Sequence, residues 1–352
     1  MDYTLLLIVV LLVVIGLVIL YSTSAYNGQV KFHDSFYYLK KQAFATVLGI
    51  VLMLFVAGMD YHIWQRLAVF GYLAAVALSV AVMLFGREIN GSKRWLALGP
   101  FSFQPSEFAK VALILFLADL VTKNVKTIGK MWTLCRIMFW ILPIVGLVGA
   151  SNLSTAIIIL GIGVILIFVA SPKYAQFALM GLAGACFMGI FLALESYRLE
   201  RLAIWRNPEK YEKGYQTLQG LYAIGSGGVF GVGLGNSVQK LGFVPEAQND
   251  MIFSIICEEL GLAGAGIIVF LFLLLIWRFF MIASGSRDLF GALIATGAMA
   301  HMMIQVILNI AVVTNTIPNT GITLPFISYG GTSVMFLLIE MGLVLSVSQV
   351  VD

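Results

Sequence analysis

The chain has 352 residues, of which 61% are hydrophobic and only 11% are charged, and its net charge at pH 7 is +4. Soluble domains carry about 25% charged residues, so this composition excludes a water-soluble globular protein. The small and dispersed positive charge gives no indication of nucleic-acid binding.

Ten apolar runs predict membrane-spanning helices, because about 20 apolar residues in a helix cross roughly 30 Å of hydrocarbon. The first run is too long for the core of a signal peptide and is expected to remain as a span. In chain order we expect spans at about 4–22, 42–58, 66–85, 106–122, 137–150, 155–170, 174–194, 251–277, 288–313 and 331–349. The predicted fold class is all-α: a polytopic membrane protein with about ten transmembrane helices, in a single integral membrane domain over 1–352. The fifth and sixth spans, joined by GASNLSTA (149–156), are expected to form a hairpin.

Basic residues in the short loops predict the orientation of the chain in the membrane. The loop after the fourth span is basic and lacks acidic residues, which favours a cytoplasmic N-terminus and, with an even number of spans, a cytoplasmic C-terminus. Five basic residues oppose this orientation because it places them outside: Lys31, Lys40, Lys41, Lys93 and Arg94.

On this topology one long loop, about 195–250, faces outward. Such a long loop, rich in basic residues, aromatic residues and glycines, is more often functional than a plain linker. Its glycine-rich run GSGGVFGVGLGN (225–236) lacks the Lys-Ser/Thr ending of a phosphate-binding loop. We therefore expect these glycines to let the backbone pack tightly beside a ligand or the membrane.

The sequence QPSE (104–107) has the features of a helix start, with Pro105 at the entry. Glu107 and Lys110 then lie one helical turn apart on one face, at the membrane edge. Two interpretations stay open: a structural ion pair, or a polar wall that lines a cavity.

The segment NTIPNTGITLPFISYGGTS (315–333) links the last two spans. Its two prolines and its glycines prevent a continuous helix. Irregular backbone at membrane depth is tolerated where it is buried in protein or lines a wet cavity, so this segment predicts a site.

Further carboxylates lie inside the predicted spans. Asp119 is four residues before Lys123, which indicates a simple helix pair. Glu258 and Glu259 point about 100° apart, so at most one of them can face a given cavity. Pairing with a basic side chain between helices is the alternative for both.

The segment VPEAQNDMIF (244–253) places Glu246 and Asp250 just ahead of the eighth span. Asp250 could cap that helix by accepting hydrogen bonds from its first amides. The basic loop before it and the glycine-proline segment expected on the same face favour a catalytic or binding role instead.

Four segments resemble the SEDS family (shape, elongation, division and sporulation), the peptidoglycan polymerases typified by FtsW and RodA. They are NGSKRW…QPSEFAK, GYQTLQ, GLGNSVQKLGFVPEAQNDMIFSIICEELG and TGITLPFISYGGTS. The resemblance runs from Tyr21 to Ser333 and is closer to the FtsW/SpoVE branch than to RodA. Three positions depart from the family pattern: Asn152 stands where an aspartate is common, and Ala311 and Asn315 where glycine is common.

The resemblance implies an enzyme that polymerises lipid II, with Asp250 as its catalytic residue. The residues that we expect to bind substrate are Glu107, Lys110, Lys93, Arg94, Arg201, Gln216, Lys240, Glu246, Ser328 and Tyr329. Lipid II and the nascent glycan are the expected ligands, in the bacterial cytoplasmic membrane. No cofactor is implied, although a divalent cation such as Mg²⁺ or Mn²⁺ stays open.

The resemblance also implies protein partners: a monofunctional class B penicillin-binding protein (a transpeptidase) and the division or elongation machinery. By resemblance, the transpeptidase contacts the eighth and ninth spans. Gly261, Gly264 and Gly266 would permit close approach of a partner helix there.

The expected chemistry needs only one carboxylate. Glycoside hydrolases use two because a poor leaving oxygen must be protonated. A pyrophosphate leaves without a proton when cations neutralise it, so one carboxylate acting as base on the attacking hydroxyl is enough. Two other functions stay open: a lipid II flippase or ion-coupled transporter, and a non-enzymatic scaffold that recruits a transpeptidase.

Overall fold

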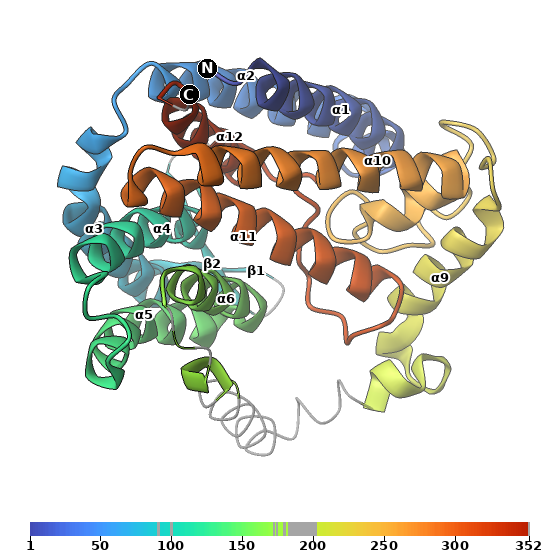
Figure 1. The fold of residues 1–352 in the computed structure, drawn as a ribbon. Coiled ribbons are helices and arrows are strands. Elements are labelled where there is room, and N and C mark those ends of the chain that lie inside the picture. The colour runs from blue at the N-terminus through green and yellow to red at the C-terminus, as the bar shows by residue number, and fades with distance from the viewer. Residues whose placement is uncertain are drawn as a thin grey trace.

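A computed structural model of the chain describes residues 1–89, 92–98, 101–171, 173, 175–178, 181 and 203–350. Within them, nine long helices form a bundle (Figure 1): α1 (Tyr3–Phe32), α2 (Tyr37–Ala57), α3 (His62–Phe85), α4 (Pro105–Asn124), α5 (Met131–Ser151), α6 (Leu153–Ala170), α10 (Ile252–Gly285), α11 (Leu289–Val313) and α12 (Gly331–Ser348). All of these except α4 are long and apolar enough to cross a membrane. The all-α, multi-pass membrane fold is confirmed, and nine of the ten predicted spans correspond to helices. The span predicted at 174–194 lies almost entirely outside the described residues.

Helix α4 lies inside the bundle and packs against α3, α5, α6, α11 and α12. Nearly all of its side chains from Glu107 to Val121 are buried. Because other helices cover it, α4 can carry Glu107 and Lys110 without exposing their charges to lipid.

Two helices extend beyond the predicted spans, α1 through a mostly polar segment and α10 beyond Arg278. Helix α1 was expected to end near residue 22, but it continues to Phe32 and ends at His33, whose φ is 56°. Helix α10 extends to Gly285 rather than to about 277. Apolar content marks where lipid ends, whereas a helix continues as long as its backbone hydrogen bonds do.

Helix α10 is interrupted at Gly261, whose φ is 66°. The glycine-rich segment packs into this interruption through backbone hydrogen bonds, including Leu262 N–H to the Gly228 carbonyl at 3.0 Å and Val232 N–H to the Glu258 carbonyl at 3.0 Å. A Cβ atom at Gly231 would lie 2.1 Å from the carbonyl oxygen of Glu259. The glycines do allow close packing, and the contact found is with the backbone of α10; packing beside a ligand or the membrane stays a prediction.

Two regions hold secondary structure that was not predicted. A small antiparallel sheet, ordered β1 (Arg87–Ile89), β2 (Ser92–Leu98) and β3 (Phe101–Phe103), lies between α3 and α4. The long segment expected as a loop contains helix α9 (Tyr215–Gly227) and two short 3₁₀ helices, Pro208–Lys210 and Glu212–Gly214. Residues of both regions line the cavity described below.

The two chain ends meet at the same end of the bundle (Figure 1). The N–H of Asp2 donates to the hydroxyl of Ser348 at 2.9 Å, and the carboxylate of Asp2 pairs with Arg278. The predicted hairpin of the fifth and sixth spans is also confirmed, because only Asn152 separates α5 from α6. Its side chain caps α6 by accepting from Thr155 N–H at 3.3 Å.

Candidate active site

A cavity of about 1530 Å³ opens among α2, the small sheet, the first turns of α4, α6 and α9, and α11 and α12. Pockets for small ligands usually measure about 300–1,000 Å³, so this cavity suits a larger substrate. Seven of the predicted site residues line it: Arg94, Glu107, Lys110, Gln216, Glu246, Asp250 and Tyr329. The irregular segment 315–333 lines it as well, as its prolines and glycines predicted.

Asp250 lies two residues before the first residue of α10, with its carboxylate at the cavity. The N-cap residue of α10 is Met251, whose own side chain forms no capping hydrogen bond. The Asp250 carboxylate forms a hydrogen bond with the backbone of Met251, so the helix-capping interpretation stays open beside a role at the cavity. The side-chain amide of Gln216 approaches one carboxylate oxygen of Asp250 at 3.5 Å, and a Cβ atom at Gly321 would lie 3.9 Å from the other.

The carboxyl group of Asp250 is a stronger base than an ordinary aspartate. Desolvation by the surrounding protein, together with the negative charge of Glu246, raises the pKa of Asp250 to about 6. At neutral pH the group is then mostly ionised but holds a proton more readily than usual, which suits a general base.

Glu246 lies on the exposed rim of the cavity with a φ of 53°, and its carboxylate accepts from the side-chain amide of Asn249. Mg²⁺ in proteins commonly takes one or two carboxylates together with substrate phosphates. Glu246 and Asp250 together could hold a divalent cation in that way. Within the described residues, no group of three or more His, Cys, Asp or Glu side chains forms a metal site.

Glu107 and Lys110 form a buried ion pair of 3.0 Å, with side chains 7% and 2% exposed. Ser333 donates to the second oxygen of Glu107 at 2.9 Å, and the Lys110 ammonium donates to Gln305 at 3.2 Å. Both interpretations of this pair hold, because the ion pair also lines the cavity.

Basic side chains outnumber acidic ones in the lining of the cavity. Among the described residues, five basic side chains line it, Lys40, Lys41, Arg94, Lys110 and Lys213, against three acidic ones, Glu107, Glu246 and Asp250. Three of these cations are ones that opposed the predicted orientation of the chain. Their place at the cavity gives a reason other than loop orientation for positive charges to occur there.

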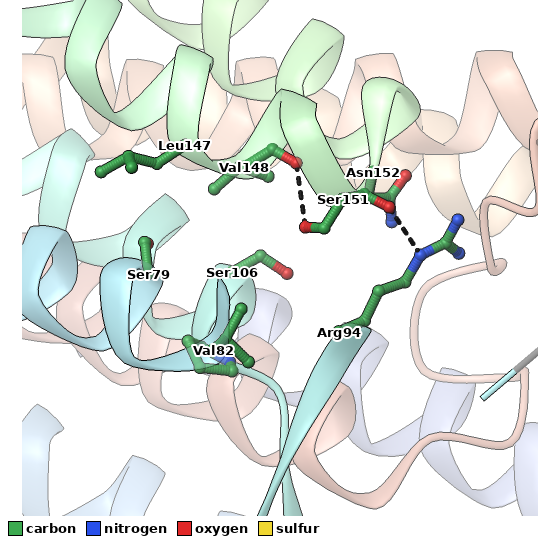
Figure 2. A pocket seen from close by; sticks show the side chains of 9 residues that line it. Ser79, Val82, Arg94, Ser106, Leu147, Val148, Ser151 and Asn152 are labelled. Atoms are coloured by element: carbon green, nitrogen blue, oxygen red, sulfur yellow. Dashed lines mark hydrogen bonds between the residues drawn. The ribbon is translucent and has the colours of Figure 1, made fainter. Parts of the chain in front are cut away.

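Arg94 also fixes the sheet to the helices. It extends from β2 toward the end of α5, where its Nε donates to the carbonyl oxygen of Ser151 at 3.1 Å (Figure 2). The end of a helix leaves carbonyl groups unsatisfied, so this bond joins the sheet to the α5–α6 hairpin. A second, very small pocket lies beside this contact, with Ser79, Val82 and Ser106 in its wall.

Two predicted substrate-binding residues lie elsewhere. Lys240 is buried and forms an ion pair with Glu259 at 2.6 Å, and its ammonium also donates to Ser22 at 3.0 Å. Ser328 is buried too: its hydroxyl donates to the Asn249 carbonyl at 2.6 Å and accepts from Leu324 N–H at 2.8 Å. Neither residue lines the cavity, so both hold the fold around it. The side chain of Lys93 and all of Arg201 fall outside the described residues.

The remaining intramembrane carboxylates have structural partners. Glu259 pairs with Lys240, as the basic-partner alternative predicted, whereas Glu258 accepts from Val238 N–H at 3.0 Å and from the hydroxyl of Ser237. Asp119 pairs with Lys123 at 2.6 Å, which confirms the predicted helix pair.

The sequence interpretation missed the polar side chains of α11. Gln305 lines the cavity, and Asn309 donates to the carbonyl oxygen of Asp250 at 2.9 Å. A signal for them exists, because His301, Gln305 and Asn309 are spaced by four residues within an apolar span and thus share one helix face.

Comparison with known proteins relates the whole chain to one family. The family model described as "Cell cycle protein", which covers FtsW, RodA and SpoVE, matches residues 3–352. Stage V sporulation protein E of Bacillus subtilis (strain 168) is 40% identical and is aligned over 99% of this chain and 97% of its own. A probable peptidoglycan glycosyltransferase FtsW of Trichlorobacter lovleyi is 35% identical over 99% of this chain and 93% of its own.

Solved structures have the same fold. Rod shape determining protein RodA of Thermus thermophilus superposes with a TM-score of 0.74 at 28% identity, covering 99% of this chain and 96% of that chain. A chain from a peptidoglycan synthase complex, described as coordinating polymerization and crosslinking, superposes with a TM-score of 0.85 at 30% identity. That match covers 99% of this chain and 97% of the other.

Proposed function

The chain belongs to the family of FtsW, RodA and SpoVE, and from that membership we propose that it is a peptidoglycan glycosyltransferase with Asp250 as its general base. It transfers the growing glycan onto lipid II with inversion at the anomeric carbon and releases undecaprenyl pyrophosphate. The observation that carries the proposal is the carboxylate of Asp250 at a large cavity whose lining holds more cations than carboxylates.

The first half of the reaction is activation of the acceptor. The 4-hydroxyl of the N-acetylglucosamine of lipid II attacks the anomeric carbon of the donor glycan, and Asp250 takes the hydroxyl proton as the new bond forms. A base works best when its pKa lies near the working pH, and the pKa of Asp250 is raised to about 6 by burial and by Glu246. Gln216, which approaches one oxygen of Asp250, helps to orient that carboxylate.

The second half is departure of the leaving group. The bond from the anomeric carbon to the pyrophosphate oxygen breaks, and the electron pair stays on the pyrophosphate. Its negative charge needs cations rather than a proton, and fixed cations stabilise developing charge without reorganising. Lys40, Lys41, Arg94 and Lys213 line the cavity and supply that charge, and Lys110 adds to it at the buried end.

The reactive sugars of a lipid-linked substrate lie at the headgroup level, so the cavity opens at the outer face of the bacterial cytoplasmic membrane. The chain ends then lie in the cytoplasm, at the opposite end of the bundle (Figure 1). A monofunctional transpeptidase is the partner, because the similar chain with the higher TM-score comes from a complex that couples polymerization to crosslinking. The similarity to FtsW and SpoVE proteins favours wall synthesis in division or sporulation.

Polymerisation of labelled lipid II by the purified protein in detergent tests the proposal. Glycan strands are expected, and they should be absent when Asp250 is replaced by Asn. A flippase has no measurable action without a bilayer, and a scaffold makes no polymer, so absence of strands from the wild-type protein, alone and with the transpeptidase, would overturn the enzymatic function.

A further inference from the structure

Helix α11 carries three polar side chains on one face: His301, Gln305 and Asn309. They are spaced by four residues, so they lie one above another along about 12 Å of the helix. All three are at most 2% exposed. Asn309 binds the backbone of Asp250, whereas Gln305 and His301 continue deeper into the bundle. Buried polar groups in a membrane helix are costly unless they are bonded, so their bonds reveal what they hold in place.

Gln305 has one possible orientation of its side-chain amide. Its Nε2 donates to the carbonyl oxygen of Thr323 at 3.0 Å, and a carbonyl can only accept. Its Oε1 therefore faces the two other neighbours, accepting from the Lys110 ammonium at 3.2 Å and from His301 Nε2 at 2.8 Å. The Nε2 atom of His301 must then carry a hydrogen.

The other nitrogen of His301 is held by α12. His301 Nδ1 lies 2.8 Å from an oxygen of Glu340, with both side chains at most 2% exposed. One proton lies between these atoms, so the pair has no net charge whether imidazolium meets carboxylate or imidazole meets carboxylic acid. Glu107 and Lys110 also cancel, and the whole buried network is neutral, which avoids the cost of an uncompensated charge.

The network leaves Lys110 available to a ligand. An ammonium has three N–H groups, and within the described residues Glu107 and Gln305 accept two of them. The residue lines the cavity, so the third N–H can donate to a substrate oxygen there. If His301 no longer donated to Gln305, the Gln305 amide could rotate, present its NH₂ group to the ammonium and displace it.

We propose that His301, held by Glu340, is a positioning residue that fixes Gln305 and through it aims the Lys110 ammonium at the lipid-linked substrate. This inference rests on the proposed function, in which Lys110 binds the anionic part of that substrate. His301 itself does not line the cavity, and it acts on substrate affinity through Lys110 rather than on the proton transfer at Asp250.

Two substitutions at position 301 separate this role from simple packing. In His301→Gln the amide nitrogen reaches about as far as Nε2 and can still donate to Gln305. In His301→Asn the shorter amide can still bond Glu340 but cannot reach Gln305. Each change is made in full-length Asp250→Asn protein, which does not turn over, and the Kd for fluorescent lipid II in detergent is measured with and without Lys110→Ala.

We expect the Kd to increase about tenfold for His301→Asn, which is the effect of one misplaced charge-assisted hydrogen bond. For His301→Gln we expect little change in Kd. In the Lys110→Ala background the effect of His301→Asn should vanish, because the group it positions is gone. An unchanged Kd for His301→Asn, or an equal increase in both backgrounds, would overturn the inference.

A third variant covers the case in which His301→Asn does not fold. Glu340→Leu keeps the side-chain volume and releases the ring, so it should weaken lipid II binding in the same Lys110-dependent way. Wild-type affinity in folded Glu340→Leu protein would overturn the inference as well. Polymerisation by the wild-type protein is scored separately, so failure of the proposed function and failure of this positioning role give different results.

Discussion

The side-chain amide of Asn309 joins two backbone carbonyls, that of Asp250 at 2.9 Å and that of Ile322 at 2.7 Å. Asn309 is fully buried, so these bonds are formed away from water. One side chain of α11 thereby fixes Asp250, two residues before α10, relative to the irregular segment after α11. The hydrogen bond from Asn309 therefore helps to set the position of Asp250, in addition to the residues next to Asp250 in the chain.

Replacing Asn309 by Leu should therefore lower both stability and rate. The change keeps the volume but leaves two buried carbonyls without a donor, which costs about 1–3 kcal/mol for each buried group left unsatisfied. We expect a lower melting temperature and a fall in kcat of roughly tenfold or more, because small displacements of a catalytic group are costly. Thr314→Ala is the control, since its hydroxyl bonds within its own helix at 2.8 Å. Equal kcat for Asn309→Leu and wild type would contradict the positioning role of Asn309.

The pH dependence of polymerisation should report the ionisation of Asp250. Burial and the charge of Glu246 raise its pKa to about 6. Only the deprotonated carboxylate accepts a proton, so kcat/KM should rise with pH through about 6 and level off near neutrality. The measurement is the rate of lipid II polymerisation between pH 5 and 8, in buffers of constant ionic strength.

The variant Glu246→Gln tests the assignment of that acidic limb. Removing the negative charge lowers the pKa of Asp250, so the limb should move to lower pH while the plateau rate changes little. Lys40→Gln is the matched control, because this substitution removes a positive charge instead of a negative one. The Lys40 ammonium pairs with Asp34 and lines the cavity. If the rise of kcat/KM with pH occurs at the same pH in Glu246→Gln as in the wild type, the rise reports the ionisation of a group other than Asp250.

Local patterns in the sequence were enough to identify the long helices and several side chains that line the cavity, whereas Asp250 was assigned by resemblance to the family. Apolar runs locate spans because each residue reports its own preference for lipid, and the i,i+3 spacing placed Glu107 beside Lys110. Lys240 was assigned to the substrate because its partner Glu259 is 19 residues away on α10, beyond any local pattern. The small sheet and the interruption at Gly261 likewise depend on contacts between segments that are distant in sequence.

The ion pair between Glu107 and Lys110 allows a charge-swap test. Each single reversal, Glu107→Lys or Lys110→Glu, buries two like charges side by side and should lower stability by roughly 3–5 kcal/mol. The double reversal restores opposite charges and hence most of the melting temperature, but it places a carboxylate where the ammonium faced Gln305 and the cavity. Polymerisation should therefore stay low in the double variant. Wild-type stability and activity in both single variants would contradict a functional pair.

The three glycines expected at the transpeptidase interface differ in their surroundings. A Cβ atom at Gly261 would lie 2.3 Å from the backbone of Gly231, and one at Gly264 would meet the side chain of Leu260. No described atom lies within 4 Å of a Cβ atom at Gly266. Only Gly266, beside exposed Leu262 and Phe270, thus lies on a free face of α10.

We expect Gly266→Leu to reduce co-purification of the transpeptidase without loss of folding, because a larger side chain blocks close helix approach. Gly261→Leu should instead destabilise the protein itself, since the position has a positive φ and is packed against backbone. Ala263→Leu, at an exposed position one turn away, is the control. Full recovery of the complex with Gly266→Leu would place the interface elsewhere.

The decisive substitution is Asp250→Asn, which keeps the shape of the side chain and removes its capacity to accept a proton. The side-chain oxygen of Asn can still accept the hydrogen bond that the Asp250 carboxylate forms with the backbone of Met251, so expression and melting temperature should stay near wild type. Loss of a general base typically costs roughly 10²–10⁴-fold in rate, so glycan strands should disappear from the lipid II assay. Glu246→Gln is the comparison, and it should retain most activity at neutral pH because Glu246 raises the pKa of Asp250 through its charge and does not itself take the proton. Processive polymer from purified Asp250→Asn protein at a rate near wild type would remove Asp250 from the mechanism and shift attention to the cations of the cavity.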